Sequence, residues 1–396
     1  MRVVLSCLPY YSHLAPVVLP VARHLRRAGH AVAVASAPAM AEPILRAGIE
    51  HLPLPHVLTL EELLADKDFA GSPGMPEAED QTPEQLAAAR SRPGRLTLLR
   101  AGSLAGTFAR DLIAAAQSWR PDVIVRENNE FGGYLAAEAL GLPRATLDVS
   151  PLNANHLPFV HDSLNGERAA LGLEPVADAY HPARGLLAGL APREFYPESM
   201  PARPDHVYRS DVDGGRLAAE FAELPDDRPL VLGGLGTVAA TVVPQTEELY
   251  TAMVAALGEL PCTALVSVGE QARDWSGPCP ANVRLMSFVP LSLLLGRAEL
   301  CVSHAGFGGV ALALTAGAPM VNVPMFGDQP PTSVRVEELG LGLHVEPTAA
   351  TAEALTEACG KVLADRTFAH RAAAMARKMA ALPGYEVFVE DVAALC

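Results

Sequence analysis

The features that would assign this chain to several familiar classes are scarce or missing. It has six cysteines, at positions 7, 262, 279, 301, 359 and 396, which are widely scattered and form no C-x-x-C pair. This spacing indicates neither a disulfide framework nor a zinc site, and it favours a reducing compartment. We therefore expect a cytoplasmic protein.

Long hydrophobic runs are also lacking. No apolar stretch reaches the roughly 18 uninterrupted residues that a membrane-spanning helix needs. The first apolar run begins directly after Met1 and Arg2 and is broken by residues 9–13. This pattern is typical of a first strand and not of a secretion signal, so we expect no membrane span.

Basic residues are too few for a nucleic-acid partner. The chain carries 30 Lys and Arg against 45 Asp and Glu, a formal charge of −15. Binding to a phosphate backbone normally uses clustered cations. An anionic small molecule would have to be held locally, by helix ends, backbone amides and a few histidines or arginines.

Aromatic residues make up only 5% of the 396 residues, whereas hydrophobic residues in total make up 50%. The abundance of Ala, Leu and Val favours helices packed on parallel strands over an all-β design. The length is too great for one ordinary core, so two domains are expected.

The most informative stretch runs from Cys301 to Gln329. An apolar run leads into His304, a glycine loop follows, then an alanine-rich helical run and a second apolar run that ends at Asp328 and Gln329. This order predicts strand, loop, helix and strand. Glycines at the start of a helix suit a bound phosphate, although the same glycines also serve tight turns and close helix packing. The polar residues on either side favour a ligand site at one edge of a parallel sheet.

The N-terminus reads as strand, helix and strand, with the strands at residues 2–8 and 30–35 and a helix opened by Pro16. The first loop lacks the G-x-G-x-x-G pattern, so it is not expected to hold a dinucleotide. His13 lies on this loop just ahead of the helix, where the helix dipole would keep its ring neutral, as a general base requires. A solvated or capping histidine is the alternative interpretation.

A family resemblance rests on three segments: Phe288-Val289-Pro290, the run from His304 to Gly309, and Asp328-Gln329. In this order they are similar to the nucleotide-sugar signature of GT-B-fold glycosyltransferases. The likeness is to the bacterial natural-product branch of the UDP-glycosyltransferase-like family, which decorates macrolides and aromatic polyketides. It covers essentially the whole chain. It departs at Gly309, where members usually carry Thr or Ser, and at Gly234, where serine is frequent.

The resemblance implies an α/β GT-B fold, with two Rossmann-like parallel-sheet domains facing each other across a cleft. We expect an N-terminal acceptor-binding domain at residues 1–205, a linker at 206–228 and a C-terminal nucleotide-sugar domain at 229–382. A final helix at 383–396 is expected to return to the N-terminal domain.

The resemblance also assigns roles to residues. His13 is the expected catalytic base and Glu127, after the strand at 122–125, its orienting carboxylate, with Glu130 as the alternative. Glu127 could instead pair with Arg126 or cap the following helix. The expected donor-binding residues are Gly236, Thr237, Phe288, Val289, His304, Gly306, Gly308, Gly309, Asp328 and Gln329. The expected acceptor-binding residues are Tyr10, Tyr11, Asn155 and Phe159, although the segment 150–162 could equally be a plain surface loop.

Asp211-Val212-Asp213 formally matches the D-x-D motif that binds a metal-diphosphate in the other large glycosyltransferase fold. It does not follow an apolar strand, and aspartates in a polar linker are typically solvated turn residues. We therefore expect no metal site.

The expected function is inverting transfer of a sugar, in particular a deoxysugar, from a TDP- or UDP-sugar to an aglycone such as a polyketide. The F-V-P form favours TDP. No cofactor or metal is expected, because fixed dipoles and His304 take the place of a cation. A nucleotide-sugar epimerase of the same fold and a non-catalytic nucleotide-sugar-binding accessory protein are the alternatives. The acceptor, the O-, N- or C-linkage and an oligomeric state stay open.

Overall fold

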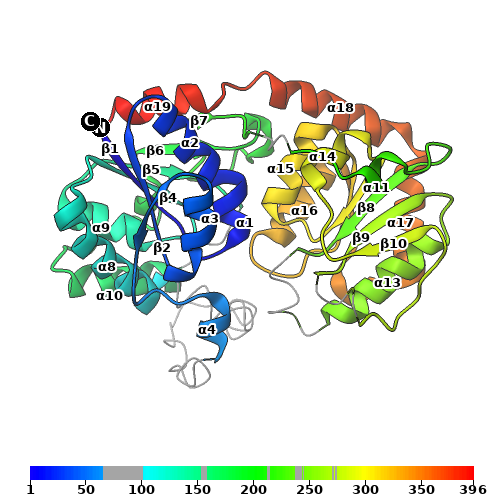
Figure 1. Cartoon of the computed structure of the whole chain (residues 1–396), viewed down its shortest axis with the longest axis horizontal. Coiled ribbons are helices and arrows are strands. Elements are labelled where there is room, and N and C mark those ends of the chain that lie inside the picture. Colours follow the sequence, from blue (N-terminus) through cyan, green and yellow to red (C-terminus); the bar gives the residue numbers. More distant parts are fainter. Residues whose placement is uncertain are drawn as a thin grey trace. The chain divides into compact units, whose positions relative to one another are not determined.

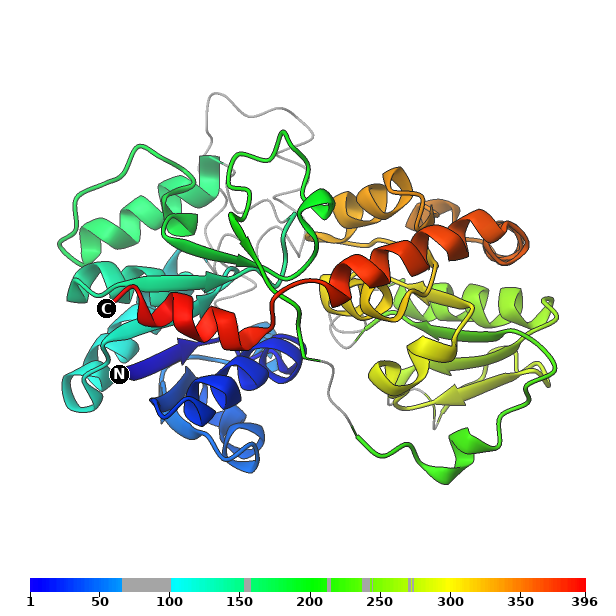
Figure 2. The same ribbon diagram turned by 90° about the horizontal axis from the view of Figure 1, so that it is seen from above.

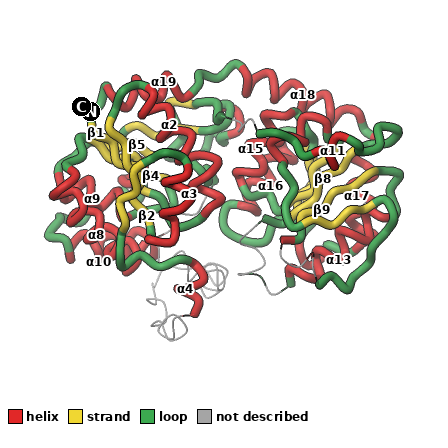
Figure 3. Tube along the Cα trace, viewed as in Figure 1, coloured by secondary structure: helices red, strands yellow, loops and turns green. Residues whose placement is uncertain are grey.

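The chain forms two compact units in a computed structural model that describes residues 1–65, 101–152, 158–211, 215–236, 243, 245–269, 272 and 274–396. The first unit comprises Met1–Asp211 together with Pro383–Cys396, and the second comprises Val212–Leu382 (Figure 1). In each unit the strands form a central layer with helices on both sides (Figure 3).

The sheet of the first unit has seven strands, all parallel, in the order β3-β2-β1-β4-β5-β6-β7. Its strands are β1 (Arg2–Ser6), β2 (Ala31–Ser36), β3 (Glu50–Pro53), β4 (Val123–Glu127), β5 (Arg144–Leu147), β6 (Leu186–Gly189) and β7 (His206–Val207). The central strands are apolar on both faces, as a parallel sheet covered by helices requires. The strand order reverses between β1 and β4, which creates a topological switch point at their carboxyl ends.

Helices cover both faces of this sheet. They are α1 (Tyr11–His13), α2 (Leu19–Arg27), α3 (Ala41–Arg46), α4 (Leu60–Ala65), α8 (Ser103–Trp119), α9 (Gly132–Leu140), α10 (Pro158–Ala170) and α19 (Tyr385–Ala393), with short 3₁₀ turns at 38–40, 181–183 and 193–195. Pro16 does not open a helix, as the sequence had predicted, but lies inside a π-helical turn, Leu14–Val18, between α1 and α2. A buried cluster that includes Val4, Phe108 and Tyr134 joins α8 and α9 to the sheet.

The sheet of the second unit has six parallel strands in the order β10-β9-β8-β11-β12-β13. Its strands are β8 (Leu230–Gly234), β9 (Thr263–Ser267), β10 (Val283–Met286), β11 (Leu300–Ser303), β12 (Met320–Asn322) and β13 (Gly342–His344). Here the order reverses between β8 and β11, so this sheet has its own switch point.

The helices of the second unit are α11 (Ala219–Ala222), α13 (Thr246–Gly258), α14 (Leu291–Leu294), α15 (Phe307–Ala316), α16 (Gln329–Glu338), α17 (Ala352–Ala364) and α18 (Arg366–Ala380). Short 3₁₀ turns lie at 295–297 and 347–349. The core packs α13 and α17 against the strands through residues such as Met253, Val302 and Leu355. Gly317, at a φ of 74°, ends α15 in the left-handed conformation that glycine adopts without strain.

The chain ends back on the first unit. Helix α19 packs against α2, and both termini lie in this unit (Figure 2). His206 and Val207, which we had placed in the linker, instead form strand β7, so the first unit extends through Asp211. Of the helices in the described part of the chain, none is long and apolar enough to cross a membrane.

Candidate functional site

Two residues predicted to act together meet at the switch point of the first sheet. His13 lies on the segment that follows β1, and Glu127 is the last residue of β4. The two are 114 positions apart in the sequence, but β1 and β4 are hydrogen-bonded neighbours, so their carboxyl ends bring the two side chains together. The His13 Nδ1 atom lies 3.3 Å from the Glu127 Oε1 atom.

The environment of Glu127 keeps this carboxylate charged. Burial alone would raise its pKa, but the His13 ring and the backbone N–H of Asn129, 2.7 Å from Oε2, outweigh burial and lower the pKa. His13 itself is 19% exposed. If its Nδ1–H donates to Glu127, the Nε2 atom carries the lone pair and is able to accept a proton.

Glu130, the alternative partner, has another task. Its carboxylate accepts hydrogen bonds from the Ser6 hydroxyl at 2.6 Å and from the backbone N–H of Gly133 at 2.8 Å, at the start of α9. Burial raises the pKa of this group to about 7. Glu130, and not Glu127, therefore caps the helix after β4.

Arg126 does not pair with Glu127, which was one of the alternatives that the sequence had left open. Successive residues of a strand point to opposite faces. The Arg126 guanidinium donates to the carbonyl oxygens of Glu130 at 2.8 Å and Asn128 at 2.9 Å. This arrangement leaves the Glu127 carboxylate to His13.

The predicted acceptor residues are only partly brought together. The Tyr10 ring meets His13 edge-on, with 5.4 Å between ring centroids, and lines a small pocket of about 30 Å³. Tyr11 is 61% exposed. Asn155 lies outside the described residues, and Phe159 belongs to α10 with its side chain outside the described part.

Most of this small pocket was missed by the sequence analysis. It is lined by apolar side chains beside the first loop and on α8, including Leu8, Val57, Leu63, Leu104, Phe108 and Phe131. The signal was weak, because apolar residues on α8 read as ordinary core. Their closeness to Tyr10 depends on the tertiary fold.

His304 lies at the switch point of the second sheet, directly after β11. Its ring is flanked by Gly236, after β8, and by Gly306. A side-chain carbon at Gly236 would lie 2.5 Å from the His304 Cε1 atom, and one at Gly306 would also collide with the ring. A side chain at either position would therefore displace the His304 ring. Burial lowers the His304 pKa to about 4, and its buried Nδ1 atom has no hydrogen-bond partner among the residues that the structure describes.

The loop after His304 has an unusual backbone and leads directly into α15. Ala305 adopts a left-handed φ of 61°, and Gly306 is the N-cap of α15. A side-chain carbon at Gly308 or Gly309 would meet no atom within 4 Å. The positive dipole end of this ten-residue helix lies at the same loop, an arrangement that suits an anion.

The other predicted donor residues differ in character. Phe288 is 71% exposed, whereas Val289 is buried. Asp328 is the N-cap of α16, and Thr237 lies outside the described residues. The side-chain oxygen of Gln329 accepts the backbone N–H groups of Met325 at 2.8 Å and Phe326 at 3.1 Å, so Gln329 braces the loop that carries Asp328.

In the D-x-D segment, the carboxylate of Asp211 lies 2.7 Å from the His24 Nε2 atom. Val212 and Asp213 are outside the described residues. Among the residues that the structure describes, no group of three or more His, Cys, Asp or Glu side chains is arranged to hold a metal ion.

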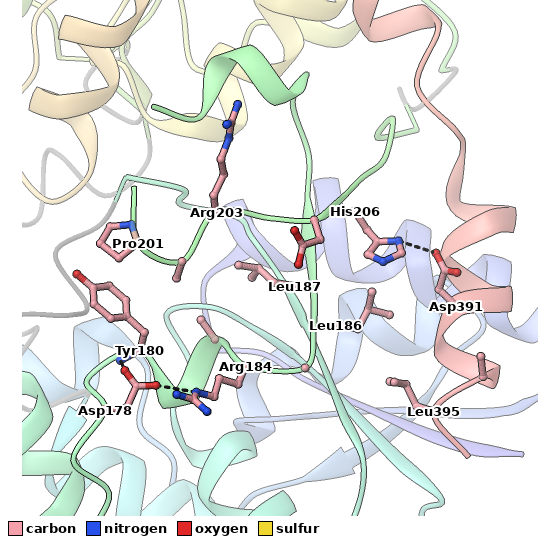
Figure 4. Close-up of a pocket in the computed structure, with 15 residues that line it drawn as sticks. Asp178, Tyr180, Arg184, Leu186, Leu187, Pro201, Arg203, His206, Asp391 and Leu395 are labelled. Atoms are coloured by element: carbon pink, nitrogen blue, oxygen red, sulfur yellow. Dashed lines mark hydrogen bonds and ion pairs between the residues drawn. The ribbon is translucent and has the colours of Figure 1, made fainter. Parts of the chain in front are cut away.

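A larger pocket, of about 680 Å³, opens where β6 and β7 begin (Figure 4). Arg184 pairs with Asp178 and His206 with Asp391 along its wall. Ligands of open α/β sheets bind at the carboxyl ends of the strands, and this pocket lies at the amino ends. It is therefore distinct from the His13 and Glu127 site.

Two family models match the chain. Residues 23–162 match "Erythromycin biosynthesis protein CIII-like, N-terminal domain" and residues 251–395 match the corresponding C-terminal domain. Tylactone mycaminosyltransferase of Streptomyces fradiae is 26% identical over 97% of this chain and 90% of its own length. Aklavinone 7-beta-L-rhodosaminyltransferase of Streptomyces galilaeus is 28% identical over 94% of this chain and 90% of its own.

Solved structures confirm the predicted fold class. The glycosyltransferase VinC, solved in complex with dTDP, has a TM-score of 0.76 at 23% identity and covers 100% of this chain and 99% of its own. The spinosyn rhamnosyltransferase SpnG has a TM-score of 0.77 at 21% identity, with 100% of both chains covered. Two parallel-sheet α/β units of the GT-B type are thus established.

Proposed function

Because this chain belongs to the glycosyltransferase family of the erythromycin CIII-like proteins, we propose that it transfers a deoxysugar from a thymidine-diphosphate sugar to a polyketide-type aglycone. The names of its relatives support both substrates. A TDP-daunosamine transferase of Streptomyces peucetius is 26% identical over 97% of this chain, and a 3-alpha-mycarosylerythronolide B desosaminyl transferase of Saccharopolyspora erythraea is 26% identical over 94%.

The contact between His13 and the ionised Glu127 is the observation that carries the acceptor half of this proposal. His13 Nε2 takes the proton of an acceptor hydroxyl as that oxygen attacks the anomeric carbon. The bond from that carbon to the diphosphate breaks on the opposite side, so the configuration inverts and the nucleoside diphosphate leaves. Glu127 stabilises the imidazolium that forms at His13.

The loop after β11 accounts for the donor half. The leaving diphosphate gains negative charge, and the start of α15 places the positive end of its helix dipole at this loop. His304 adds a ring N–H donor at the same place. Phe288 is exposed and directly precedes the buried Val289. Its exposed aromatic face suits contact with a nucleoside base.

We further propose that the reaction needs no metal ion, because the α15 amides and His304 supply the stabilisation that a divalent cation provides elsewhere. A cytoplasmic location, expected from the cysteine usage, is part of the same proposal. An activity that survives chelation of divalent cations supports the first point, and an activity abolished by chelation and restored by magnesium contradicts it.

Substitution of His13 by alanine tests the catalytic role. We expect kcat to fall about 100- to 10,000-fold, the usual contribution of a general base, while TDP affinity stays unchanged. His344→Ala is the control, because His344 also pairs with a glutamate, Glu337, but lies on β13 in the second unit. Glu127→Gln keeps the size of the side chain and is expected to lower kcat as well.

The readouts are initial rates of sugar transfer and calorimetric titration with TDP. If His13→Ala retains the wild-type kcat on a hydroxyl acceptor, His13 is not the base. If the wild-type protein binds neither TDP nor UDP, the donor assignment itself is wrong.

A further inference from the structure

A chain of buried polar groups lies behind the glycine loop of the second unit. Ser303 and Asn322 are the last residues of β11 and β12 and pair in register. The Ser303 hydroxyl donates to the Asn322 Oδ1 atom at 2.9 Å and accepts the backbone N–H of Ala305 at 3.1 Å. Asn322 is fully buried and Ser303 nearly so.

The last link of this chain fixes an unfavourable backbone conformation. Ala305 is one of two non-glycine residues with positive φ in the described part of the chain, and an alanine adopts this conformation only when its surroundings hold it there. Ala305 stands between His304 and Gly306. Its conformation therefore sets both the direction of the His304 ring and the start of α15.

Asn322 shows that this arrangement was not optimised for stability alone. Its buried Nδ2 atom has no hydrogen-bond partner in the described part of the chain, which costs stability that an apolar residue of similar size would avoid. Its Oδ1 atom serves the loop by accepting the hydrogen bond from the Ser303 hydroxyl. A polar group kept at a cost in stability is often found beside a functional site.

We propose that Ser303 and Asn322 are positioning residues for the diphosphate subsite. They hold Ala305 in its left-handed conformation and so aim His304 and the α15 amides at the phosphates, without touching the nucleotide. This inference rests on the proposed function of the same loop.

Ser303→Ala tests the inference. We expect TDP to bind about five- to tenfold more weakly, the effect of one lost hydrogen bond, with a matching rise in the KM for the donor and a smaller change in kcat. Thr315→Val is the matched control. It removes one hydroxyl from the last turn of α15, where Thr315 donates to the Ala311 carbonyl at 2.8 Å, and should leave TDP binding at the wild-type value.

Rescue variants separate positioning from a general loss of structure. Glycine adopts positive φ without strain, so adding Ala305→Gly to Ser303→Ala should recover most of the TDP affinity. Asn322→Asp keeps an acceptor oxygen and should bind TDP more tightly than Asn322→Leu. Asn322→Leu also removes the unpartnered donor, so its melting temperature should not fall in step with its affinity.

Two results would overturn the inference: Ser303→Ala binding TDP as tightly as the wild type, or the double variant binding as weakly as Ser303→Ala alone. Should Ser303→Ala fail to fold, the comparison of Asn322→Asp with Asn322→Leu decides. Absence of TDP binding by the wild-type protein would instead refute the proposed function, so the two failures are distinguishable.

Discussion

Two histidines of this chain follow central strands but lie in opposite electrostatic environments. His13 contacts a buried, ionised carboxylate, which fixes the orientation of its ring. His304 lies in a buried setting that favours its neutral form and lowers its pKa to about 4. Under the proposed function the same residue type serves two tasks, proton uptake at His13 and hydrogen-bond donation at His304.

The lowered pKa of His304 makes folding stability depend on pH. An unfolded chain protonates this histidine near pH 6.5, whereas the folded protein does so only near pH 4. Between these values the unfolded state binds more protons, so stability is lost as the pH falls. Between pH 7 and pH 4.5, we expect the free energy of unfolding to fall by about 2 to 3 kcal/mol less in His304→Gln than in the wild type.

Urea unfolding of both proteins across this range measures the difference, and other titrating groups cancel in the comparison. His344→Gln serves as the control for a histidine outside the loop. A wild-type-minus-variant difference that stays constant with pH would show that His304 is not held neutral by burial.

Gly309 gives a second prediction at the scale of one residue. The family resemblance predicts Thr or Ser at this position, and among the described residues no atom lies within 4 Å of a side-chain carbon at Gly309. We expect Gly309→Ser to bind TDP about threefold to tenfold more tightly, since a hydroxyl at this position gains about one hydrogen bond to the diphosphate. Gly309→Ala is the control, because it shares the improved helix propensity without the hydroxyl. Equal TDP affinity for the two variants would contradict the explanation.

At the scale of elements, Glu130 joins three parts of the first unit. Its carboxylate lies in the turn after β4, accepts from Ser6 at the end of β1 and from Gly133 at the start of α9. Gly133 has to be glycine, because a side-chain carbon there would collide with the Ser6 hydroxyl. This junction fixes the end of β4 and therefore the position of Glu127.

The raised pKa of Glu130 predicts a pH effect of the opposite sign. Between about pH 4.5 and pH 7 the folded protein holds a proton that the unfolded chain has lost. The stability contributed by this group is complete below that range and is lost as the pH rises through 7. From pH 4.5 to pH 8, we expect the free energy of unfolding of the wild type to fall, relative to that of Glu130→Gln, by on the order of 3 kcal/mol.

Chemical denaturation of the two proteins at several pH values is the measurement. Glutamine keeps the size of the side chain and is able to bond both Gly133 and Ser6, so packing changes little. Parallel pH profiles for the two proteins would mean that Glu130 is ionised throughout and that its hydrogen bonds outweigh burial.

At the scale of the whole molecule, the candidate histidine of each unit lies at the corresponding position of its sheet. Both sheets are parallel, and in both the key histidine follows a strand beside the switch point, His13 after β1 and His304 after β11. The chain passes between the two units twice, after Asp211 and before Pro383, and the first unit holds both of these segments. The Arg209 N–H donates to the Pro383 carbonyl at 2.8 Å, and Asp211 lies against His24 on α2.

The sequence by itself determined what is local. Apolar runs with glycine loops predicted two parallel-sheet α/β units, now confirmed, because burial on both faces and helix starts are written in neighbouring residues. The glycine loop at His304 was found for the same reason. The domain boundaries were harder to predict from local sequence, since β7 is only two residues long and no sequence pattern indicates its pairing with β6.

Only the tertiary structure decided which polar groups meet. The choice between Glu127 and Glu130 depends on the pairing of β1 with β4 across more than a hundred residues, and so does the bond from Ser6. Gln329 faces inward, and Ser303 and Asn322 form a pair, because of strand register and helix packing. Such contacts join segments distant in the chain, and no local propensity records them.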